Sequence, residues 1–374
     1  MPDLFLPGPF AEPDLLTAIL GPGAEPPDLT PAEVRNHAFR IDPLGARMAL
    51  VRAPGETAPG AVARKVPAET AERLRFALAA FGAWRTVLAA TSAGPAEVML
   101  VSPEEAPAAP WTATPDPDWR AHLVEVAAEV MPFLGEREAE EVRGMLKGLS
   151  FRALARVRGP ASPAPVTVRR GFSIGEIERV GLERPYTKYF AVEEHQLRHP
   201  RFDGRMSVVV DRAVWASGDA VTILPFDPVR REVLLIEQFR PGPYARRDPC
   251  PWSLEPVAGR CDAGEDPEAT ARREAREEAD LTLGRLALIG RYYSSPGTIA
   301  EYLTSYVGEA DLEGAGGIHG LAEEEEDIRV AVLPLETALG LLETGEVNNG
   351  PLLISLLWLR SEAERLARDW SRRP

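Results

Sequence analysis

Residues 255–281 read EPVAGRCDAGEDPEATARREAREEADL, and this stretch decides most of what the sequence predicts. Asp266 suits a helix N-cap and Pro267 suits the first helical position, so we expect a helix from 267 to about 279. Glu277 and Glu278 follow Glu274 by three and four residues, which brings three carboxylates to one side of that helix. Crowded carboxylates repel one another, and at least one pKa rises unless cations lie among them.

Two interpretations of these glutamates stay open when the helix is considered alone. Carboxylate oxygens grouped in this way suit hard divalent cations such as Mg²⁺ or Mn²⁺. Alternatively, the glutamates form an ordinary solvated helix face, on which Arg272, Arg273 and Arg276 pair with them.

The spacing around the helix favours the first interpretation. The stretch resembles the Nudix box, G-x5-E-x7-R-E-U-x-E-E-x-G-U, and every charged position of that pattern is matched. The matching residues are Gly259, Glu265, Arg273, Glu274, Ala275, Glu277, Glu278 and Leu281. Asp280 stands where the family has glycine, at the exit of the helix. Because aspartate tolerates the left-handed conformation better than most residues, we expect local strain there rather than lost activity.

The Nudix resemblance implies hydrolysis of a nucleoside diphosphate linked to another moiety, in a domain built as an α/β/α sandwich with a mixed sheet. By similarity, the metal ligands would be the carboxylates of Glu274 and Glu278, the carbonyl of Ala258, and Glu277 as an additional ligand and candidate catalytic residue. Gly259 would belong to the structural part of the box, in which Glu265 and Arg273 form the internal pair that orients the loop. Bound Mg²⁺, with Mn²⁺ as the alternative, would neutralise the diphosphate and make the attacking water more acidic.

The segments that flank the box resemble the ADP-ribose pyrophosphatase branch of Nudix enzymes, which includes the tellurite-resistance-associated bacterial members. These segments are LIEQFRPGPY (235–244), PWSLEPVAG (251–259), SSPGTIAE (294–301) and GIHGLAEEEEDIRV (317–330). The resemblance covers about residues 178–370. In that branch a glutamate on a loop after the box is the general base, and Glu324 is our first candidate and Glu326 our second. Taken alone, the acidic run at 323–327 would be a solvated loop.

The same resemblance implies a set of substrate contacts. Arg240 would grip the diphosphate with its planar, always-charged guanidinium. Glu301 matches a substrate-contacting glutamate, although its SPGGTSE-like context is altered here to SPGTIAE. Tyr189, or the adjacent Phe190, would stack on adenine, with packing on a sheet as the alternative for both aromatic residues. Arg212 would reach the substrate across the interface of a homodimer.

The composition indicates which partners and which cellular location to expect. The chain has 374 residues, with 42 Lys+Arg against 57 Asp+Glu and a net charge of −15, which argues against general nucleic-acid binding. Two cysteines and no visible secretory signal predict a reduced, cytoplasmic protein. The longest apolar run, 351–359, is shorter than the ~20 residues of a membrane span, so we expect a soluble protein with no membrane partner.

The clearest domain boundary in the sequence is the segment RGPASPAPVTVRR at 158–170, whose prolines and small residues are typical of a stiff linker. It predicts domains at 1–158 and 172–374, joined by a linker at 159–171. Residues 4–21 and 72–82 resemble degenerate forms of the motifs of gamma-glutamylcyclotransferase-like domains. This resemblance implies a small mixed α/β barrel-like domain. Leu78 stands where that family has its acid, and a leucine cannot move a proton, so the resemblance implies a degenerate domain.

The sequence therefore predicts an α/β (α+β) protein that hydrolyses ADP-ribose to AMP and ribose 5-phosphate with Mg²⁺, as a cytoplasmic homodimer. One alternative is a pyrophosphatase for another nucleotide sugar, such as ADP-glucose or GDP-mannose. The other is a non-catalytic ADP-ribose sensor whose N-terminal half is the output module.

Overall fold

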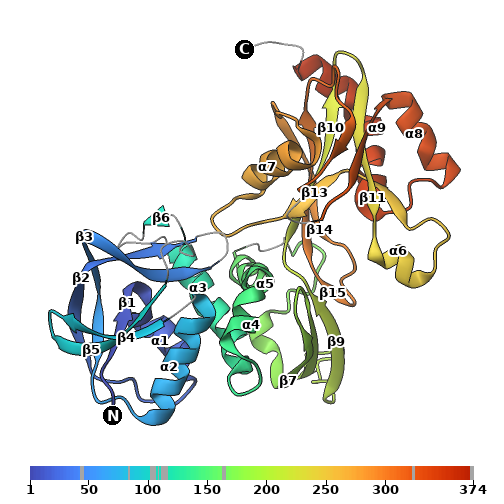
Figure 1. Ribbon diagram of the computed structural model, residues 1–374. Helices are drawn as coiled ribbons and strands as arrows, with labels where there is room; N and C mark the ends of the chain where they lie inside the picture. Colours follow the sequence, from blue (N-terminus) through green and yellow to red (C-terminus); the bar gives the residue numbers. More distant parts are fainter. Residues whose placement is uncertain are drawn as a thin grey trace. The chain divides into compact units, whose positions relative to one another are not determined.

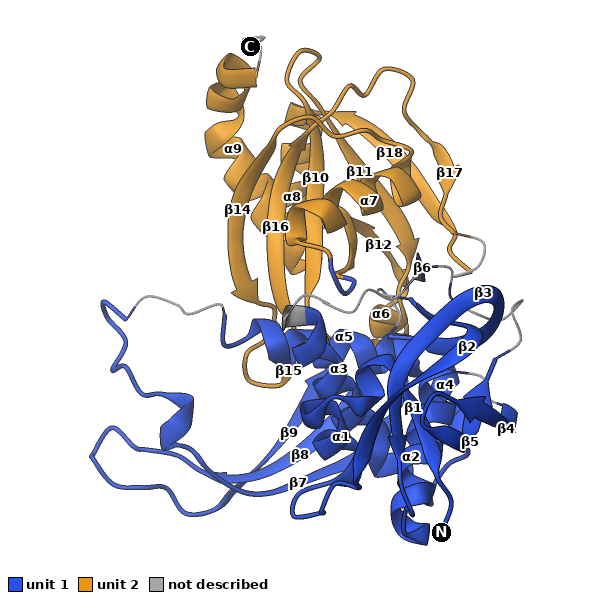
Figure 2. Cartoon of the chain, turned by 90° about the vertical axis from the view of Figure 1, so that its left-hand side faces the viewer, with its two compact units in different colours: residues 1–217, 262–264 blue, residues 218–261, 265–374 orange. Residues whose placement is uncertain are grey.

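A computed structural model describes residues 1–42, 46–82, 85–101, 107, 109–110, 117–161, 166–321 and 325–370. The chain forms two compact units, coloured separately in Figure 2. Unit 1 comprises Met1–Ser217 with Asp262–Gly264, and unit 2 comprises Gly218–Cys261 with Glu265–Pro374. These units are compact parts of the chain and are not the same as the domains predicted from the sequence, 1–158 and 172–374, which stay a prediction.

Unit 1 begins with a mixed sheet in the order β4-β5-β1-β3-β2-β6. Its strands are β1 (Leu4–Pro7), β2 (Leu29–Ile41), β3 (Met48–Ala63), β4 (Arg85–Thr91), β5 (Gly94–Leu100) and β6 (Ala109–Pro110). β1 runs parallel to β5 and antiparallel to β3. In the described residues this order has two ends, β4 and β6, and β6 pairs only with Arg40 and Ile41 of β2. The barrel expected for this half is therefore wrong as a closed structure, because so short an end strand does not carry the sheet around to β4.

The helices of unit 1 bury their apolar faces against this sheet (Figure 1). They are η1 (Gly8–Ala11), α1 (Pro13–Leu20), α2 (Ala68–Phe81), α3 (Pro117–Val130), η2 (Met131–Phe133), α4 (Ala139–Gly144) and α5 (Leu146–Arg158). A further short helix, η3 (Ile174–Glu176), buries none of its residues. Phe81 of α2 meets Phe10 edge to face, with ring centroids 5.6 Å apart. Leu78 of the same helix is 1% exposed and belongs to this core.

The last part of unit 1 is an antiparallel meander of β7 (Glu178–Thr187), β8 (Ala191–Arg198) and β9 (Val210–Ala216). Phe190 packs on this meander between Tyr186 and Trp215, with ring centroids at 5.2 and 4.6 Å. That is the sheet-packing alternative that the sequence left open for Phe190.

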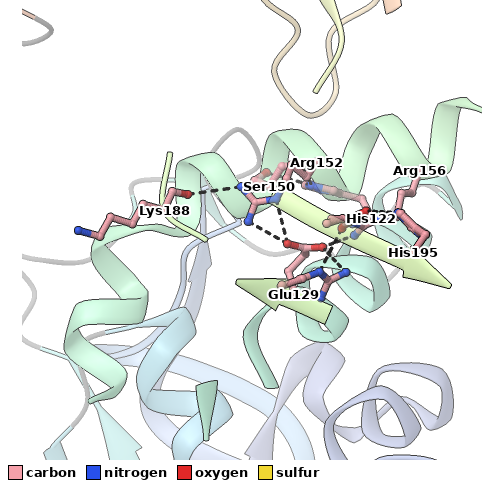
Figure 3. Close-up of polar contacts among 9 residues, drawn as sticks. His122, Glu129, Ser150, Arg152, Arg156, Lys188 and His195 are labelled. Carbon is pink, nitrogen blue, oxygen red and sulfur yellow. Dashed lines mark hydrogen bonds and ion pairs between the residues drawn. The ribbon is translucent and has the colours of Figure 1, made fainter. Parts of the chain in front are cut away.

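A buried ion cluster ties this meander to helices α3 and α5 within unit 1 (Figure 3). Glu129 of α3 has a fully buried side chain and accepts hydrogen bonds from Nε and Nη2 of Arg152 at 3.0 and 2.9 Å. Arg156 of α5 pairs with the same glutamate and with Glu193 of β8. Arg184 of β7 also reaches both carboxylates, at 3.1 Å each. Because the charges are desolvated, each partner depends on the others for compensation.

Unit 2 contains a sheet whose main path is β14-β16-β10-β11-β18-β17. Its strands are β10 (Ala220–Asp227), β11 (Glu232–Phe239), β12 (Trp252–Glu255), β13 (Val257–Arg260), β14 (Leu286–Tyr293), β16 (Tyr302–Glu309), β17 (Gly317–His319) and β18 (Ile328–Pro334). A short strand, β15 (Ile299–Ala300), precedes β16. β10 and β11 pair only next to their turn and then separate, β10 pairing with β13 and β11 with β12. Where β10 and β11 diverge, β13 lies beside β10 and β12 lies beside β11.

Helices cover both faces of the unit 2 sheet (Figure 2). They are α7 (Pro267–Ala279), α8 (Leu335–Thr344) and α9 (Gly350–Trp370). The short helix α6 (Pro241–Arg246) buries none of its residues. Alternate strand residues divide between the faces. Ile223 packs with the buried alanines of α7, whereas Leu224 packs with Leu352 and Leu356 of α9. Unit 2 is therefore a helix–sheet–helix sandwich, and no helix in the described residues has the length and apolar character to cross a bilayer.

Candidate active site

Local sequence fixes the ends of α7, the helix that carries the three glutamates. The carboxylate of Asp266 accepts the N–H of Ala269 at 2.8 Å and caps the first turn, and Pro267 takes the first helical position. At the other end Asp280 lies in the left-handed region with φ 51°, and its N–H bonds back to the carbonyls of Ala275 and Arg276. Asp280 therefore adopts the conformation that the family pattern gives to glycine.

Glu274 and Glu278 lie on the buried side of α7, facing β13. Their residues are 9% and 3% exposed. Glu278 accepts the N–H of Ala258 at 3.0 Å, and Ala258 is held in place because β13 pairs with β10. The helix and the strand thus bring two carboxylates and the Ala258 backbone together.

Burial changes the acidity of both glutamates. Desolvation is the main cause that raises the pKa of Glu274 to about 7, and the charges of Glu277 and Glu326 add to it. Desolvation likewise raises the pKa of Glu278 to about 8, with further contributions from Glu274 and Glu326, against the lowering effect of the Ala258 N–H. Both carboxyl groups therefore stay protonated to a higher pH than an ordinary glutamate, unless a cation beside them stabilises the ionised form.

Arg273 is the cation that the chain itself supplies. Its Nε and Nη2 donate to the two carboxylate oxygens of Glu265 at 3.0 Å each, which is the pair that the Nudix resemblance implies. Its Nη1 donates to Glu274 at 2.7 Å and to Glu277 at 2.9 Å. Burial alone would lower the pKa of Arg273, but these carboxylates raise it above its ordinary value.

The donor set has the chemistry for a hard divalent cation: buried carboxylates with raised pKa values beside a backbone carbonyl at Ala258. In the described part of the chain, no group of three or more His, Cys, Asp or Glu side chains already has the arrangement of a metal cage. Arg273 accounts for part of this, since it engages Glu274 and Glu277 itself. The residues present therefore fit Mg²⁺ by chemistry, with Arg273 competing for the same carboxylates.

Glu326, in the acidic run at 323–327, acts on this cluster through its charge. Glu326 accepts the N–H of Leu321 at 3.1 Å, and its charge contributes to the raised pKa of Glu274 and of Glu278. Glu324, the first candidate for the general base, lies outside the described residues. The structure thus brings the second candidate, Glu326, into electrostatic reach of the box.

Arg240 joins the same neighbourhood at the end of β11. Its Nη2 donates to Glu255 at 2.6 Å and its Nε at 3.0 Å. Burial alone would lower the pKa of Arg240, but Glu255, Glu278 and Glu326 together raise it. Arg240 is therefore a half-buried cation in the neighbourhood of the box carboxylates.

The other predicted substrate residues lie on or between other strands. Glu301 accepts a hydrogen bond from Ser294 Oγ at 3.1 Å. Tyr189 and Arg212 belong to unit 1: Tyr189 is 60% exposed between β7 and β8, and Arg212 lies on β9 opposite His195. Their roles stay predictions.

Sequence reasoning missed a cavity of about 560 Å³ beside Arg240. It is lined by Arg240, Gly242, Pro243, Arg246, Asp248, Ser253, Glu255, Asn348 and Asn349. Asn349 caps α9, accepting the N–H of Leu352 at 2.9 Å, and this cap is the one local signal in the sequence. Nothing in the sequence indicates that the cap lies next to β12, almost 100 positions earlier.

Comparison with known proteins agrees with this geometry. A family model described as the NUDIX domain matches residues 216–356. The ADP-ribose pyrophosphatase of Escherichia coli (strain K12) is 42% identical over 207 residues, which cover 55% of this chain and 97% of that protein. The GDP-mannose pyrophosphatase of Citrobacter koseri is 33% identical over 153 residues, covering 41% of this chain and 78% of that protein. Among solved structures, a chain titled "Crystal structure of ADP compounds hydrolase" covers 51% of this chain and 98% of its own at 21% identity, with a TM-score of 0.39.

Proposed function

This chain belongs to the Nudix family of hydrolases, and from that premise we propose that it hydrolyses ADP-ribose to AMP and ribose 5-phosphate, with Mg²⁺ as its cofactor, in the cytoplasm. The observation that carries the proposal is the buried pair of Glu274 and Glu278. Their pKa values are raised, so a bound cation would stabilise their ionised form. The 42% identity to an ADP-ribose pyrophosphatase, over 97% of that protein, supports the substrate.

The residues that would hold Mg²⁺ are Glu274, Glu277 and Glu278, together with the carbonyl of Ala258. When bound, such an ion supplies charge neutralisation for the diphosphate and a more acidic water. The chain's own part is to bind the diphosphate through Arg240, to exclude bulk water from the buried carboxylates, and to take a proton from the attacking water. The oxygen of that water forms a bond to one phosphorus, the bridging P–O bond breaks, and AMP and ribose 5-phosphate are released.

The proton acceptor in this scheme is a glutamate of the loop at 323–327, with Glu324 the first candidate and Glu326 the second. The effect of Glu326 on the pKa of both box glutamates supports a position near the reacting atoms. A general base contributes about 10²- to 10⁴-fold to the rate. Comparison of Glu324→Gln with Glu326→Gln therefore identifies the base as the residue whose loss costs turnover in that range.

We further propose a homodimer in which the β7–β9 meander meets a second copy, with Tyr189 and Arg212 serving its substrate. The exposed apolar side chains of this meander support it: Val180, Tyr186 and Trp215 are 51%, 40% and 45% exposed. For the N-terminal part of the chain we propose a degenerate gamma-glutamylcyclotransferase-like origin without proton-transfer chemistry, supported by the buried Leu78 where the acid would stand.

Two rival functions remain to be compared with this proposal. The GDP-mannose pyrophosphatase of Citrobacter koseri, at 33% identity, supports a different nucleotide sugar as substrate. A non-catalytic ADP-ribose sensor would need none of the metal-binding carboxylates, yet the chain keeps Glu274, Glu277 and Glu278. We therefore place the enzyme ahead of the sensor.

The deciding experiment incubates the full chain with ADP-ribose, ADP-glucose and GDP-mannose, with Mg²⁺ or with EDTA, and measures release of the nucleoside monophosphate. Mg²⁺-dependent AMP release that is fastest from ADP-ribose supports the proposal. Faster cleavage of GDP-mannose moves the substrate to the first rival, and tight binding of ADP-ribose without any cleavage moves the function to the second.

A further inference from the structure

The cavity beside Arg240 is a feature of unit 2 in which no lining residue other than Arg240 has a predicted role. Its volume of about 560 Å³ falls in the range of roughly 300–1,000 Å³ typical of small-molecule sites. We propose that it holds the sugar moiety of the nucleotide-sugar substrate, on the side of the diphosphate away from the nucleoside. This inference rests on the proposed function and assigns a second part of the same substrate.

The lining of the cavity suits hydroxyl groups rather than a nucleobase. Apart from Gly242 and Pro243, every lining residue carries a polar or charged side chain. A nucleobase is usually held by stacking on aromatic side chains. Phe239 and Trp252 are close by, but they alternate along their strands with Arg240 and Ser253 and so face the other side of the sheet. Neither ring lines the cavity.

Several hydrogen-bonding groups at the cavity are unused in the described part of the chain. The hydrogen bonds of Arg240 go to Glu255 through Nε and Nη2, which leaves Nη1 free to donate. Asn348 accepts a long bond of 3.4 Å from Ser253 and has an unused side-chain N–H₂. Gln238, which is not among the lining residues, is 8% exposed and has a buried Nε2 without a partner. Gln238 faces the same side as Ser253 because the two residues are directly opposite on β11 and β12.

Acceptors lie beside these donors. Glu255 and Asp248 line the cavity with carboxylate oxygens, and the Asp248 side chain is 25% exposed. A sugar hydroxyl both donates and accepts, so a site for it needs both kinds of partner. The charges of Glu278 and Glu326 also act on Arg240, which places the cavity next to the box. The diphosphate would thus lie at Arg240, with the sugar beyond it.

The test uses two variants of the full chain, Asn348→Ala and Asp248→Asn. The second variant keeps the side-chain carbonyl that accepts the N–H of Cys250, bonded at 3.1 Å in the structure. The matched control is Asp311→Asn, on an exposed turn of unit 2. For each protein, calorimetry measures the affinity for the two products, ribose 5-phosphate and AMP, and kinetics gives KM and kcat for ADP-ribose. Thermal unfolding checks that each variant is folded.

We expect both variants to weaken ribose 5-phosphate binding about 5- to 10-fold and to raise KM for ADP-ribose by a similar factor, as is typical for one lost hydrogen bond at a polar site. AMP binding, kcat and the control should change less than twofold. Weaker AMP binding with unchanged ribose 5-phosphate binding would assign the cavity to the nucleoside and overturn the proposal, and so would two variants that match the wild type. If the wild type cleaves no nucleotide sugar, the hydrolase assignment fails by itself, and the loss of ribose 5-phosphate binding still decides the cavity.

Discussion

Gly259 lies so close to Glu274 that a Cβ on Gly259 would stand 1.7 Å from Oε1 and 1.9 Å from Cδ of that glutamate. These distances leave no room for any side chain at position 259 unless the carboxylate moves. The glycine that begins the box is thus explained by space: β13 passes α7 with only a hydrogen atom facing the proposed metal ligand.

This relationship predicts that Gly259→Ala displaces the Glu274 carboxylate and lowers kcat for ADP-ribose. Misplacement of a reacting or ligating group by about 1 Å costs on the order of 10²-fold in rate. Turnover is measured with Mg²⁺, and thermal unfolding shows whether the variant folds. Gly340→Ala in α8 is the control, because a Cβ there meets nothing within 4 Å. Equal turnover of the two variants would mean that Glu274 is not held where the reaction needs it.

The metal ligands are tested by Glu274→Gln and Glu278→Gln. Each change keeps the shape of the side chain but removes one negative charge, so we expect weaker Mg²⁺ binding and a fall in turnover of at least ~10²-fold. In Glu278→Gln the side-chain amide oxygen would still accept the N–H of Ala258, so the fold should persist. Mn²⁺ titration followed by electron paramagnetic resonance measures the affinity independently of activity. Glu336→Gln, with a side chain 79% exposed on α8, is the control. Wild-type affinity and turnover in both variants would refute the assigned ligands.

The raised pKa values predict how the metal-free protein responds to pH. The ordinary value for glutamate is 4.5, and the folded values are about 7 for Glu274 and about 8 for Glu278. Between about pH 5 and 8 the folded state therefore binds more protons than the unfolded state, so stability falls as pH rises through this window. We expect Tm in EDTA to drop by at least about 3 °C from pH 5.5 to pH 8.

Mg²⁺ should reverse this trend, because it binds the ionised carboxylates and releases their protons. The increase in Tm on adding Mg²⁺ should therefore be larger at pH 8 than at pH 6. Glu278→Gln removes one of the two titrating groups and should flatten the profile in EDTA. A Tm in EDTA that rises steadily from pH 5.5 to pH 8 would contradict the raised pKa values.

The parts of the fold that the sequence predicts correctly are those with local signals. Asp266 and Pro267 mark the start of α7, which runs from 267 to 279 as the sequence predicts. The long pair β2 and β3 was not foreseen, since proline and glycine at 54–55 and 59–60 are typical of turns. In the structure Pro59 and Gly60 pair with the preceding strand β2, whereas 54–55 lie at an irregularity of the pair, where Gly55 has φ 86°. The valine-rich run at 207–210 favours a strand by composition, but β9 begins only at Val210, where it pairs with Leu197 of β8.

The same division holds for the site. The spacing of Glu274, Glu277 and Glu278 is a property of one helix, so the sequence is sufficient to group them. The contact of Arg240 with Glu255 depends on the pairing of β11 with β12, and the cavity depends on where the loop before α9 lies. Neither is encoded in a short segment. The pairing of Arg273 with Glu274 is one alternative that the sequence leaves open, and only the side-chain positions show that it forms.

The buried ion cluster of unit 1 predicts that Glu129→Gln strongly destabilises this unit. The variant leaves Arg152, Arg156 and Arg184 without the carboxylate that they share, and breaking a buried ion pair typically costs about 3–5 kcal/mol. Urea unfolding followed by circular dichroism measures the change. Glu140→Gln, whose side chain is 84% exposed in its pair with Arg143, should cost less than about 1 kcal/mol. Equal midpoints for the two variants would show that the cluster contributes little net stability.

Leu78 offers a test of whether the N-terminal half takes part in the chemistry. Its side chain is 1% exposed in the core between α2 and the first sheet, so Leu78→Ala should cost unit 1 about 2–5 kcal/mol through the cavity that it leaves. A leucine exchanges no proton, and the proposed reaction uses only residues of the Nudix half. We therefore expect kcat/KM for ADP-ribose to stay within about twofold at temperatures where the variant is folded.

The control for this prediction is Leu88→Ala on β4, where the side chain is 76% exposed and its loss should change stability by no more than about 0.5 kcal/mol. Thermal unfolding and steady-state kinetics on the same preparations separate the two effects. A loss of kcat/KM well beyond twofold in folded Leu78→Ala, with Leu88→Ala unchanged, would mean that the core of the N-terminal half supports the active site. In that case the N-terminal half would contribute to catalysis even though Leu78 replaces the acid expected from the gamma-glutamylcyclotransferase-like resemblance.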